Sequence, residues 1–365
     1  MVAVSDPQVF FTGFPGFLGS ALLERVLARG DGPVACLVQP KYLETARERA
    51  REIADGLDGV DREDAISLHE GDITEPDLGL EDSADLEGVS EVYHLAAVYD
   101  LGVDRDLAEA VNVGGTEHVL DFAEDVDLEQ FHYVSTCYVS GRYDGVFTED
   151  HLQEGQSFNN HYEETKYRAE VAVQDRMDVG LPATIYRPAI TVGDSWTGET
   201  DKYDGPYYLL ESIRTQPSWL SVTFSLPGSS DAELNVVPRD YVVDAIAYLS
   251  DRESSVGEVY QLCDPTPLSV PDFVDALAAA AGHRVVSVPT PKLLARRVLE
   301  QLEDSGTSVE PETLEYLDHP TRYACPATKR ALAGSGLEVP PFESYVDRLV
   351  AFVEENPDVG DEAMV

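Results

Sequence analysis

The chain has 365 residues, of which 43% are hydrophobic, a length that suits two or three compact units or one α/β domain with an added substrate-binding region. Aspartate and glutamate number 69 and lysine and arginine 25, so the formal net charge is −44. This balance excludes nucleic acids and anionic membranes as partners, because no basic stripe is available for phosphates. The acids are spread along the whole chain, and salt screens their mutual repulsion, so the composition predicts a halophilic protein.

The cysteines and the first residues of the chain bear on its compartment. Cys36, Cys137, Cys263 and Cys325 lie far apart, without the spacing of a zinc site or of a disulfide framework. The N-terminal stretch MVAVSDPQVFFTG lacks the basic and apolar parts of a signal peptide. No run approaches the 18 apolar residues of a membrane span. We therefore expect a cytoplasmic protein without membrane insertion.

Short apolar runs alternate with amphipathic stretches in the first half of the chain. The apolar runs predict strands at 8–12, 33–39, 65–73, 91–98, 130–140 and 183–193. The stretches between them predict helices at 17–30, 41–56, 106–125 and 162–177. Strands that alternate with helices indicate an α/β fold with a parallel sheet covered on both faces. The fold class predicted is a Rossmann-type doubly wound sheet.

The alternation ends at residue 193. The segment 194–208 is rich in turn formers and predicts a loop, and helices are predicted at 240–250, 271–282 and 293–304, with a strand at 259–264. We expect an NAD(P)-binding domain of residues 1–193, to which 236–264 returns. A smaller, partly helical substrate-binding cap would comprise 194–235 and 265–355, followed by a flexible tail at 356–365.

The first motif, TGFPGFLG, follows the first predicted strand and opens the first predicted helix. Glycine lets the backbone approach a pyrophosphate, whose negative charge a helix N-terminus favours. The motif therefore predicts dinucleotide binding. The cofactor contacts expected here are Thr12, Gly13, Phe14, Gly16, Phe17, Leu18 and Gly19.

The ends of the next three strands supply further expected cofactor contacts. After the second strand, Gln39 stands where an acid would bind the ribose hydroxyl of NAD, and Lys41 is close by. This pair favours NADP, with NAD as the alternative. The small residues of HLAA let a cofactor lie against the backbone, and the acid of GDIT is placed to reach the adenine. These two motifs add Asp72, Ile73, Ala96 and Ala97.

The fifth strand ends in VSTCYVSG, which places Ser135 and Thr136 at the carboxyl edge of the sheet. A hydroxyl there can donate to a substrate carbonyl or to its developing negative charge. The alternative is that these hydroxyls bond only to the local backbone. Cys137 is expected to be a buried structural cysteine, because no partner that would lower its pKa is visible.

Tyr162 and Lys166 are four residues apart on the next predicted helix, so they share one face. A tyrosine has an ordinary pKa near 10, too high for a base at neutral pH. A neighbouring ammonium and an oxidised nicotinamide would both lower that pKa. We expect Tyr162 to exchange the proton, and Lys166 to tune it and to bind the ribose.

The chain resembles the extended short-chain dehydrogenases/reductases over roughly residues 8–245. TGFPGFLG, GDIT, HLAA, NVGGT, VSTCYVSG, YEETK and YRPAITVGD occur in the order of that family. The resemblance implies a catalytic triad with a second hydroxyl beside it, a residue that supports the cofactor side, and a turn over the nicotinamide. The implied triad is Thr136, Tyr162 and Lys166, and Ser135 is the second hydroxyl. By the same resemblance, Asn112 supports the cofactor side, and Arg187 and Pro188 lie at the turn over the nicotinamide.

Within this family the chain most resembles the fatty-acyl-CoA reductase, thioester reductase or "male sterility" branch. The segments that carry this are TGFPGFLG, VSTCYV, RPAITVGDSWTGETDKYDGPYYLL and LNVVPRDYVVDAI. The branch implies hydride transfer from NADPH to an acyl thioester or another carbonyl, and the family implies a homodimer. The alternatives are a nucleotide-sugar epimerase or dehydratase with retained NAD, a dihydroflavonol- or hydroxysteroid-type alcohol dehydrogenase, and a non-catalytic dinucleotide-binding or redox-sensing subunit.

Overall fold

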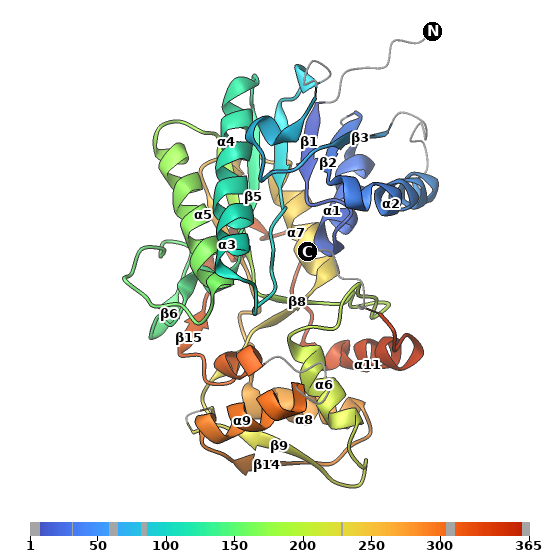
Figure 1. The fold of residues 1–365 in the computed structure, drawn as a ribbon, viewed down its shortest axis with the longest axis vertical. Helices are drawn as coiled ribbons and strands as arrows, with labels where there is room; N and C mark the ends of the chain where they lie inside the picture. The colour runs from blue at the N-terminus through green and yellow to red at the C-terminus, as the bar shows by residue number, and fades with distance from the viewer. Residues whose placement is uncertain are drawn as a thin grey trace.

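A computed structural model describes residues 8–30, 32–57, 65–81, 86–227, 229–303 and 311–359. Figure 1 shows two parts, a sheet with helices packed on it and, below it, a smaller part built around α6, α8 and α9. Of the tail expected at 356–365, residues 360–365 lie outside the described residues, as do 304–310 of the expected cap. Residues 356–359 follow the last helix, and the backbone oxygen of Asn356 accepts a hydrogen bond from Tyr203.

In the described part of the chain, seven parallel strands form the main sheet, in the order β12-β7-β5-β4-β1-β2-β3. This confirms the predicted doubly wound architecture, because the order reverses between β1 and β4. The strands are β1 (Val9–Thr12), β2 (Val34–Val38), β3 (Ile66–Glu70), β4 (Glu91–His94), β5 (Gln130–Val134), β7 (Ala183–Pro188) and β12 (Val259–Leu262).

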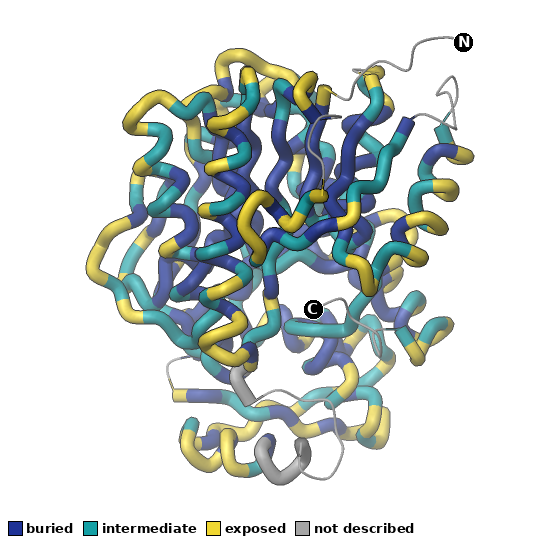
Figure 2. The backbone as a smooth tube through the Cα atoms, turned by 45° about the horizontal axis from the view of Figure 1, so that its top comes forward, coloured by how far each residue is buried: buried dark blue, intermediate teal, exposed yellow. Residues whose placement is uncertain are grey.

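Helices cover both faces of the sheet, so its central strands are buried on both sides (Figure 2). Phe11 of β1 packs in the core under α1 and α7, whereas its neighbour Phe10 packs in the core under α4 and α5. Successive strand residues point to opposite faces, which explains this division. The covering helices are α1 (Phe17–Arg29), α2 (Leu43–Gly56), α4 (Gly115–Asp125), α5 (His161–Asp178) and α7 (Arg239–Ser250).

Several predicted strands end earlier than expected, at the carboxyl edge of the sheet. β3, β4 and β5 stop at Glu70, His94 and Val134, and after β5 the chain turns into the short helix η5 (Cys137–Ser140). The strand predicted at 183–193 breaks after Pro188, which has no N–H to donate. The chain then forms β8 (Ile190–Val192), which pairs with β11 (Val236–Pro238) outside the main sheet.

The helix predicted at 106–125 is three elements. It begins as α3 (Arg105–Ala108), continues as a π-helical turn, η4 (Glu109–Gly114), and ends as α4. The helix predicted at 41–56 likewise begins with a separate turn, η1 (Pro40–Tyr42). The remaining short helices of the sheet part are η2 (Pro76–Gly79) and η6 (Glu253–Ser255).

The cap contains more regular structure than its sequence predicted. The loop predicted at 194–208 ends early, because Pro206 opens α6 at a position where its missing N–H costs nothing. The described cap elements are α6 (Pro206–Arg214), β9 (Ser221–Ser225), β10 (Glu233–Leu234), β13 (Leu268–Ser269), α8 (Val270–Ala280), β14 (Val285–Pro289), α9 (Lys292–Glu303), η7 (Pro311–Tyr316), η8 (Phe342–Ser344) and α11 (Val346–Glu355). β9 pairs with β14 and β10 with β13.

One segment that we expected in the cap packs on the sheet part instead. β15 (Thr321–Tyr323) pairs with β6 (Gly145–Phe147), and α10 (Pro326–Ala331) follows it. Tyr323, Cys325 and Leu332 join the same core as Phe11. The four cysteines are all buried and free. None of the described helices has the length and apolar content needed to cross a bilayer.

Candidate active site

The carboxyl ends of the central strands open into one cavity of about 1380 Å³ that continues into the cap. Almost all of the predicted site residues line it, although they come from seven separate stretches of sequence. The exceptions are Asn112 and Arg187. The predicted residues that do line it are Thr12, Gly13, Phe14, Gly16, Phe17, Leu18, Gly19, Gln39, Lys41, Asp72, Ile73, Ala96, Ala97, Ser135, Thr136, Tyr162, Lys166 and Pro188.

The glycines of TGFPGFLG fill places that no side chain fits. Gly13 has a φ of +92°, and a Cβ on it would lie 2.8 Å from the backbone nitrogen of Ala96. A Cβ on Gly19 would lie 2.2 Å from the backbone oxygen of Gly13. The turn is therefore tight, and it presents its backbone and the N-terminus of α1 to the cavity, as binding of a pyrophosphate requires.

A buried histidine that we did not predict joins the first strand to the fourth. Thr12 Oγ1 lies 2.8 Å from His94 Nδ1, and His94 Nε2 lies 3.0 Å from Thr116 Oγ1. Thr116 in turn donates to the Asn112 backbone oxygen at 2.7 Å, so His94 Nε2 must donate and Nδ1 must accept. Burial lowers the pKa of His94 to about 3, so it is neutral. His94 stands in the HLAA motif, from which we had taken only the alanines.

Asn112 lies beside the cavity and not in its wall. Its side-chain oxygen accepts from the Val98 N–H at 2.9 Å, and its amide nitrogen donates to the Val98 oxygen and to Thr165 Oγ1, both at 3.0 Å. The π-helical turn sets this orientation, and such turns often occur at functional sites. Asn112 thus joins the chain after β4 to α5, the helix that carries Tyr162 and Lys166.

At the far end of the glycine turn, Gln39 donates to Asp72 Oδ2 at 2.7 Å. Asp72 Oδ1 also accepts from the backbone and side chain of Thr74, at 2.9 and 2.8 Å. Two cations, Lys41 and Arg49, are among the wall residues at this end. Arg49 lies 3.6 Å from Asp201 of the loop that leads to α6. This end of the cavity therefore combines a neutral amide and two cations with the carboxylates of Asp72 and Asp201.

Thr136 and Tyr162 both line the cavity, and Thr136 is close enough to Tyr162 to affect the pKa of its phenol. Thr136 Oγ1 also accepts from the Tyr138 N–H at 3.2 Å and makes a 3.4 Å contact with the Pro188 oxygen. Burial raises the pKa of Tyr162 to about 12, although the nearby hydroxyl of Thr136 opposes the rise. Tyr162 is therefore a protonated phenol at neutral pH.

Lys166 is buried one turn below Tyr162. Its Nζ donates to Tyr133 Oη at 2.9 Å and to the Val134 oxygen at 3.0 Å. Burial lowers the pKa of Lys166 to about 7, and nearby Glu170 opposes the change. We expected Lys166 to lower the pKa of Tyr162, but in the chain alone its ammonium is held by Tyr133 and the pKa of Tyr162 is raised. Nothing in the sequence marked Tyr133, because an aromatic residue in a central strand is usually core.

Ser135 lines the cavity as predicted, but its hydroxyl bonds to Glu170, and Arg187 lies outside the cavity wall. Ser135 donates its hydroxyl proton to Glu170 Oε2 at 2.6 Å, so that proton is not available to a substrate oxygen. Arg187 is fully buried and pairs with the same carboxylate, Nη2 to Oε1 at 2.5 Å. Gln174 also donates to Glu170, at 3.0 Å. The side chains of Ser135, Arg187 and Gln174 all bond to Glu170, so the four form one polar cluster with Glu170 at its centre.

Comparison with known proteins agrees with this geometry. Residues 11–246, well over half of the chain, match the model of the NAD-binding family described as male sterility protein. The chain is 27% identical over 286 residues to a linear gramicidin synthase of Brevibacillus parabrevis, covering 74% of this chain and 6% of that protein. It is 27% identical over 283 residues to the fatty acyl-CoA reductase wat of Drosophila melanogaster, covering 66% and 53%.

Among solved structures, the chain is similar to the terminal R domain from the myxalamid PKS-NRPS biosynthetic pathway. The TM-score is 0.80 at 27% identity, over 99% of this chain and 94% of that one. By contrast, the chain spans only 6% and about half of the two curated relatives named above. The chain belongs to the NAD(P)-binding family of the male sterility protein, a branch of the extended short-chain dehydrogenases/reductases.

Proposed function

We propose that the protein is an NAD(P)H-dependent reductase that acts on an acyl thioester or on the corresponding aldehyde. The observation that carries this proposal is the juxtaposition of Thr136, Tyr162 and Lys166 with the glycine turn in one cavity. One of the two curated relatives named above is a fatty acyl-CoA reductase, which supports the same chemistry. A bound nicotinamide dinucleotide would supply the hydride.

The state of the three side chains suits the reductive direction. A reduction needs a proton donor at the carbonyl oxygen, and Tyr162, with its pKa raised to about 12, carries that proton at neutral pH. Thr136 lines the same cavity as Tyr162 and affects the pKa of its phenol, so a carbonyl oxygen bound by the phenol would lie near the Thr136 hydroxyl. Lys166 lies beneath both and is held by Tyr133, ready to bond to a ribose.

The net reaction balances as follows. One hydride adds to the carbonyl carbon of the thioester and one proton is consumed, the carbon–sulfur bond breaks, and the products are an aldehyde, a thiol and the oxidised cofactor. Reduction of the aldehyde takes a second hydride, and the proton from Tyr162 goes to the oxygen, which becomes an alcohol. The residues of the chain supply orientation, the proton and the hydrogen bonds to the oxygen.

NADPH is the cofactor we propose, in preference to NADH. The support is local: Gln39 is hydrogen-bonded to Asp72, and the cations Lys41 and Arg49 line that end of the cavity. A cation in this place favours a 2′-phosphate. We also propose a cytoplasmic, halophilic protein that forms a homodimer, on the strength of the −44 net charge, the four free cysteines and the family resemblance.

Turnover with a mutant control tests the proposal. Oxidation of NADPH and NADH would be followed in molar KCl with acyl-CoA thioesters, aldehydes, ketones and nucleotide sugars. Tyr162→Phe should lower turnover by a factor of about 10² to 10⁴ while cofactor affinity stays within about twofold. Tyr167→Phe, on the same helix but outside the cavity wall, is the matched control.

The remaining outcomes would either refute the role of Tyr162 or point to another function. Near-normal turnover of Tyr162→Phe would refute the role of the phenol. Silence with thioesters and aldehydes, together with tightly retained NAD and turnover of a nucleotide sugar, would favour an epimerase or dehydratase. Cofactor binding without turnover of any substrate would favour a sensor.

A further inference from the structure

The two residues proposed to act on the carbonyl oxygen lie on separate elements. Thr136 is the N-cap of η5, where its Oγ1 accepts the Tyr138 N–H at 3.2 Å. Tyr162 is the second residue of α5 and so stands in its first turn. The N–H groups of a first turn have no partner within the helix, so groups outside the helix must hold this turn in place. The distance between Thr136 and Tyr162 therefore depends on what holds the start of α5 against η5.

A reciprocal set of side-chain bonds caps α5. Asn160 is the N-cap, and its Oδ1 accepts the Glu163 N–H at 2.9 Å. The Glu163 carboxylate, which is fully buried, accepts from the backbone and the side chain of Asn159 at 2.8 and 3.0 Å. This arrangement is similar to a capping box. It fixes the first turn only while the amide of Asn160 keeps its oxygen toward Glu163.

Tyr316, the last residue of η7 in the cap, holds the Asn160 amide in that orientation. It is 6% exposed, lines the cavity, and accepts a hydrogen bond on its Oη from Asn160 Nδ2 at 3.0 Å. The amide offers its oxygen to the Glu163 N–H and its nitrogen to the phenol, and neither atom can take the place of the other. A reversed amide would place its NH2 group against the Glu163 N–H, donor against donor. The Tyr316 hydroxyl is therefore part of the cap of the catalytic helix.

The ring of Tyr316 also packs on η5. It meets the ring of Tyr138 edge to face, with the centroids 4.8 Å apart and the planes at 89°. Tyr138 is the residue whose N–H donates to Thr136, and like Tyr316 it lines the cavity. The ring of Tyr316 stacks as well with that of the buried His319, at a centroid distance of 6.1 Å. Tyr316 thus contacts both elements that carry the reacting groups, although it belongs to the cap.

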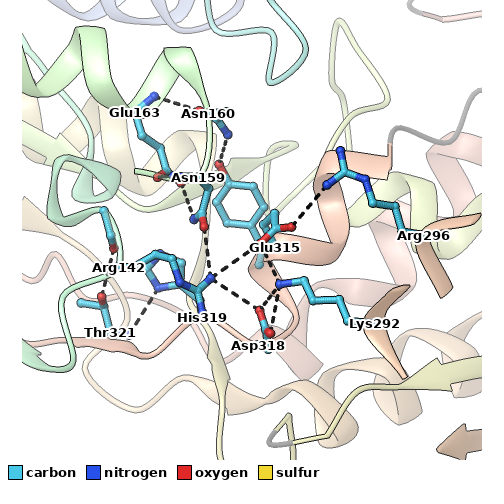
Figure 3. A network of polar contacts seen from close by, with 12 residues as sticks. Arg142, Asn159, Asn160, Glu163, Lys292, Arg296, Glu315, Asp318, His319 and Thr321 are labelled. Carbon is cyan, nitrogen blue, oxygen red and sulfur yellow. Dashed lines mark hydrogen bonds and ion pairs between the residues drawn. The ribbon is translucent and has the colours of Figure 1, made fainter. Parts of the chain in front are cut away.

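An ionic clasp made by Arg142, Lys292, Glu315 and Asp318 holds the chain on both sides of Tyr316 (Figure 3). Lys292 of α9 binds Glu315 at 2.7 Å and Asp318 at 2.8 Å. Arg142, from the sheet part, lies 3.7 and 3.6 Å from the same two carboxylates and donates to Asn159 at 3.1 Å. The clasp thus ties the cap to the residue next to the N-cap of α5, and Tyr316 lies between the two carboxylates in the chain.

We propose that Tyr316 is a positioning residue: its hydroxyl orients the N-cap of α5 and its ring supports η5, so that together they set the distance between Tyr162 and Thr136. The inference rests on the proposed function and adds a cap residue to its machinery. Tyr316 acts through Asn160 and Tyr138 and exchanges no proton itself. Because a reacting group misplaced by about 1 Å can cost on the order of 100-fold in rate, its loss should appear in the rate of the chemical step and not in cofactor binding.

A single-turnover experiment with the full chain tests this. Tyr316→Phe removes the hydroxyl and keeps the ring against Tyr138. The protein would be loaded with NADPH in molar KCl and mixed with saturating butanal. The rate constant of NADPH oxidation should fall by about tenfold or more, while the amplitude and the KM for NADPH stay within about twofold. A merely structural role would lower the amplitude, which counts competent molecules, and leave the rate constant unchanged, and that result would overturn the inference.

Two further variants test the route through Asn160. Asn160→Ser keeps a good N-cap but has no amide nitrogen to donate to Tyr316, so it should lower the same rate constant by a similar factor. The double variant should lie within about twofold of the slower single one, because both changes remove one interaction. Tyr203→Phe is the matched control, since this cap tyrosine lies outside the cavity wall and its hydroxyl donates to the Asn356 oxygen at 2.6 Å. Fully multiplicative losses, or a Tyr203→Phe as slow as Tyr316→Phe, would contradict the route.

Hydrogen exchange separates this inference from the proposed function, because it needs no turnover. Deuterium uptake would be followed by mass spectrometry in peptides that cover residues 160–166. Tyr316→Phe should speed uptake there by about fivefold or more, and Tyr203→Phe should not. That pattern supports the role of Tyr316 in the cap of α5 even if no carbonyl compound is reduced. Tyr162-dependent turnover with the same rate constant and the same uptake in Tyr316→Phe would leave the reductase intact and overturn the positioning role.

Discussion

The two ends of the cavity are built in opposite ways. The cofactor end consists of a tight glycine turn, strand ends and short polar contacts, such as Gln39 to Asp72 at 2.7 Å. The cap end consists largely of apolar side chains from α6, α8, α9 and the segment around η7, and its charged wall residues lie in the loop 199–204 that leads to α6. Directional hydrogen bonds at one end fix an orientation, whereas non-directional burial at the other selects by size and polarity.

The reacting centre, with Thr136 and Tyr162, lies between the two ends of the cavity. We expect the largest effect from a substitution that changes this centre and leaves both ends intact. Thr136→Val keeps the size of the side chain and removes its hydroxyl. It should lower kcat by about 10² to 10³, the loss typical of one hydrogen-bond donor to a developing oxyanion. Binding of the cofactor should change by no more than about twofold, because its expected contacts are the glycine turn and the strand ends. Thr215→Val, exposed at the end of α6, is the control for a surface hydroxyl, and a kcat like that of the control would contradict the role of Thr136.

The two ends also differ in how far their residues were predictable. Gly13, Lys41 and Asp72 lie at turns and strand ends, where the backbone order alone determines which residues meet. The fold, the family and the set of residues around the cofactor end followed from that order. Tyr133 and Glu170 did not, because their partners Lys166 and Ser135 come from other elements, and only the packed structure decides which hydroxyl meets which charge.

The cap end was not predictable for a related reason. Val270 and Val274 have the spacing of an amphipathic helix, which indicates a buried face but not whether that face meets core or cavity. The return of β15 to pair with β6 was also missed, since a three-residue strand carries almost no pattern. Pairing between strands so far apart in the chain depends on tertiary contacts that periodicity does not report.

The buried Lys166 at the cofactor end can be tested by measuring how the free energy of unfolding depends on pH. The folded-state pKa of Lys166 is about 7 and its ordinary value is 10.5, so between these pH values the unfolded chain binds more protons than the folded one. The free energy of unfolding of the natural protein should therefore rise with pH across that window. Lys166→Met removes this dependence, and its stability relative to the natural protein should fall by about 2 kcal/mol or more from pH 7 to pH 10.

Chemical denaturation at several pH values measures that difference. Lys329→Met, an exposed lysine of α10, is the matched control for the loss of one cation. Only the change of the difference with pH is diagnostic, because Lys166→Met also loses the bonds to Tyr133 and Val134. A difference that stays constant across the window would show that Lys166 is not held in the buried environment described here.

We expect the choice between NADPH and NADH to depend on Lys41, at the end of the cavity that also holds Gln39 and Asp72. Lys41→Ala should raise the KM for NADPH about tenfold, since a charge-assisted contact with a phosphate is lost, and should leave the KM for NADH within about twofold. Steady-state kinetics with both cofactors measures the ratio. Arg47→Ala, on the adjacent helix α2 and paired with Glu44, removes a cation outside the wall and serves as control. An equal change for both cofactors would assign Lys41 to general steering.

Salt should have the smallest effect on the site. It distinguishes charge effects on the stability of the whole chain from charge effects on substrate binding in the cavity. Raising KCl from about 0.1 M to about 1 M shortens the Debye length from about 10 Å to about 3 Å, which screens the repulsion within a chain of net charge −44. The thermal midpoint should rise by a few degrees or more over this range. The KM for a neutral aldehyde should change by no more than about twofold, because the aldehyde carries no charge for salt to screen. A constant or falling midpoint would refute the halophilic prediction. A KM for a neutral aldehyde that depended strongly on salt would show that charged groups contribute to binding at the cap end, which would contradict the division of the cavity into two unlike ends.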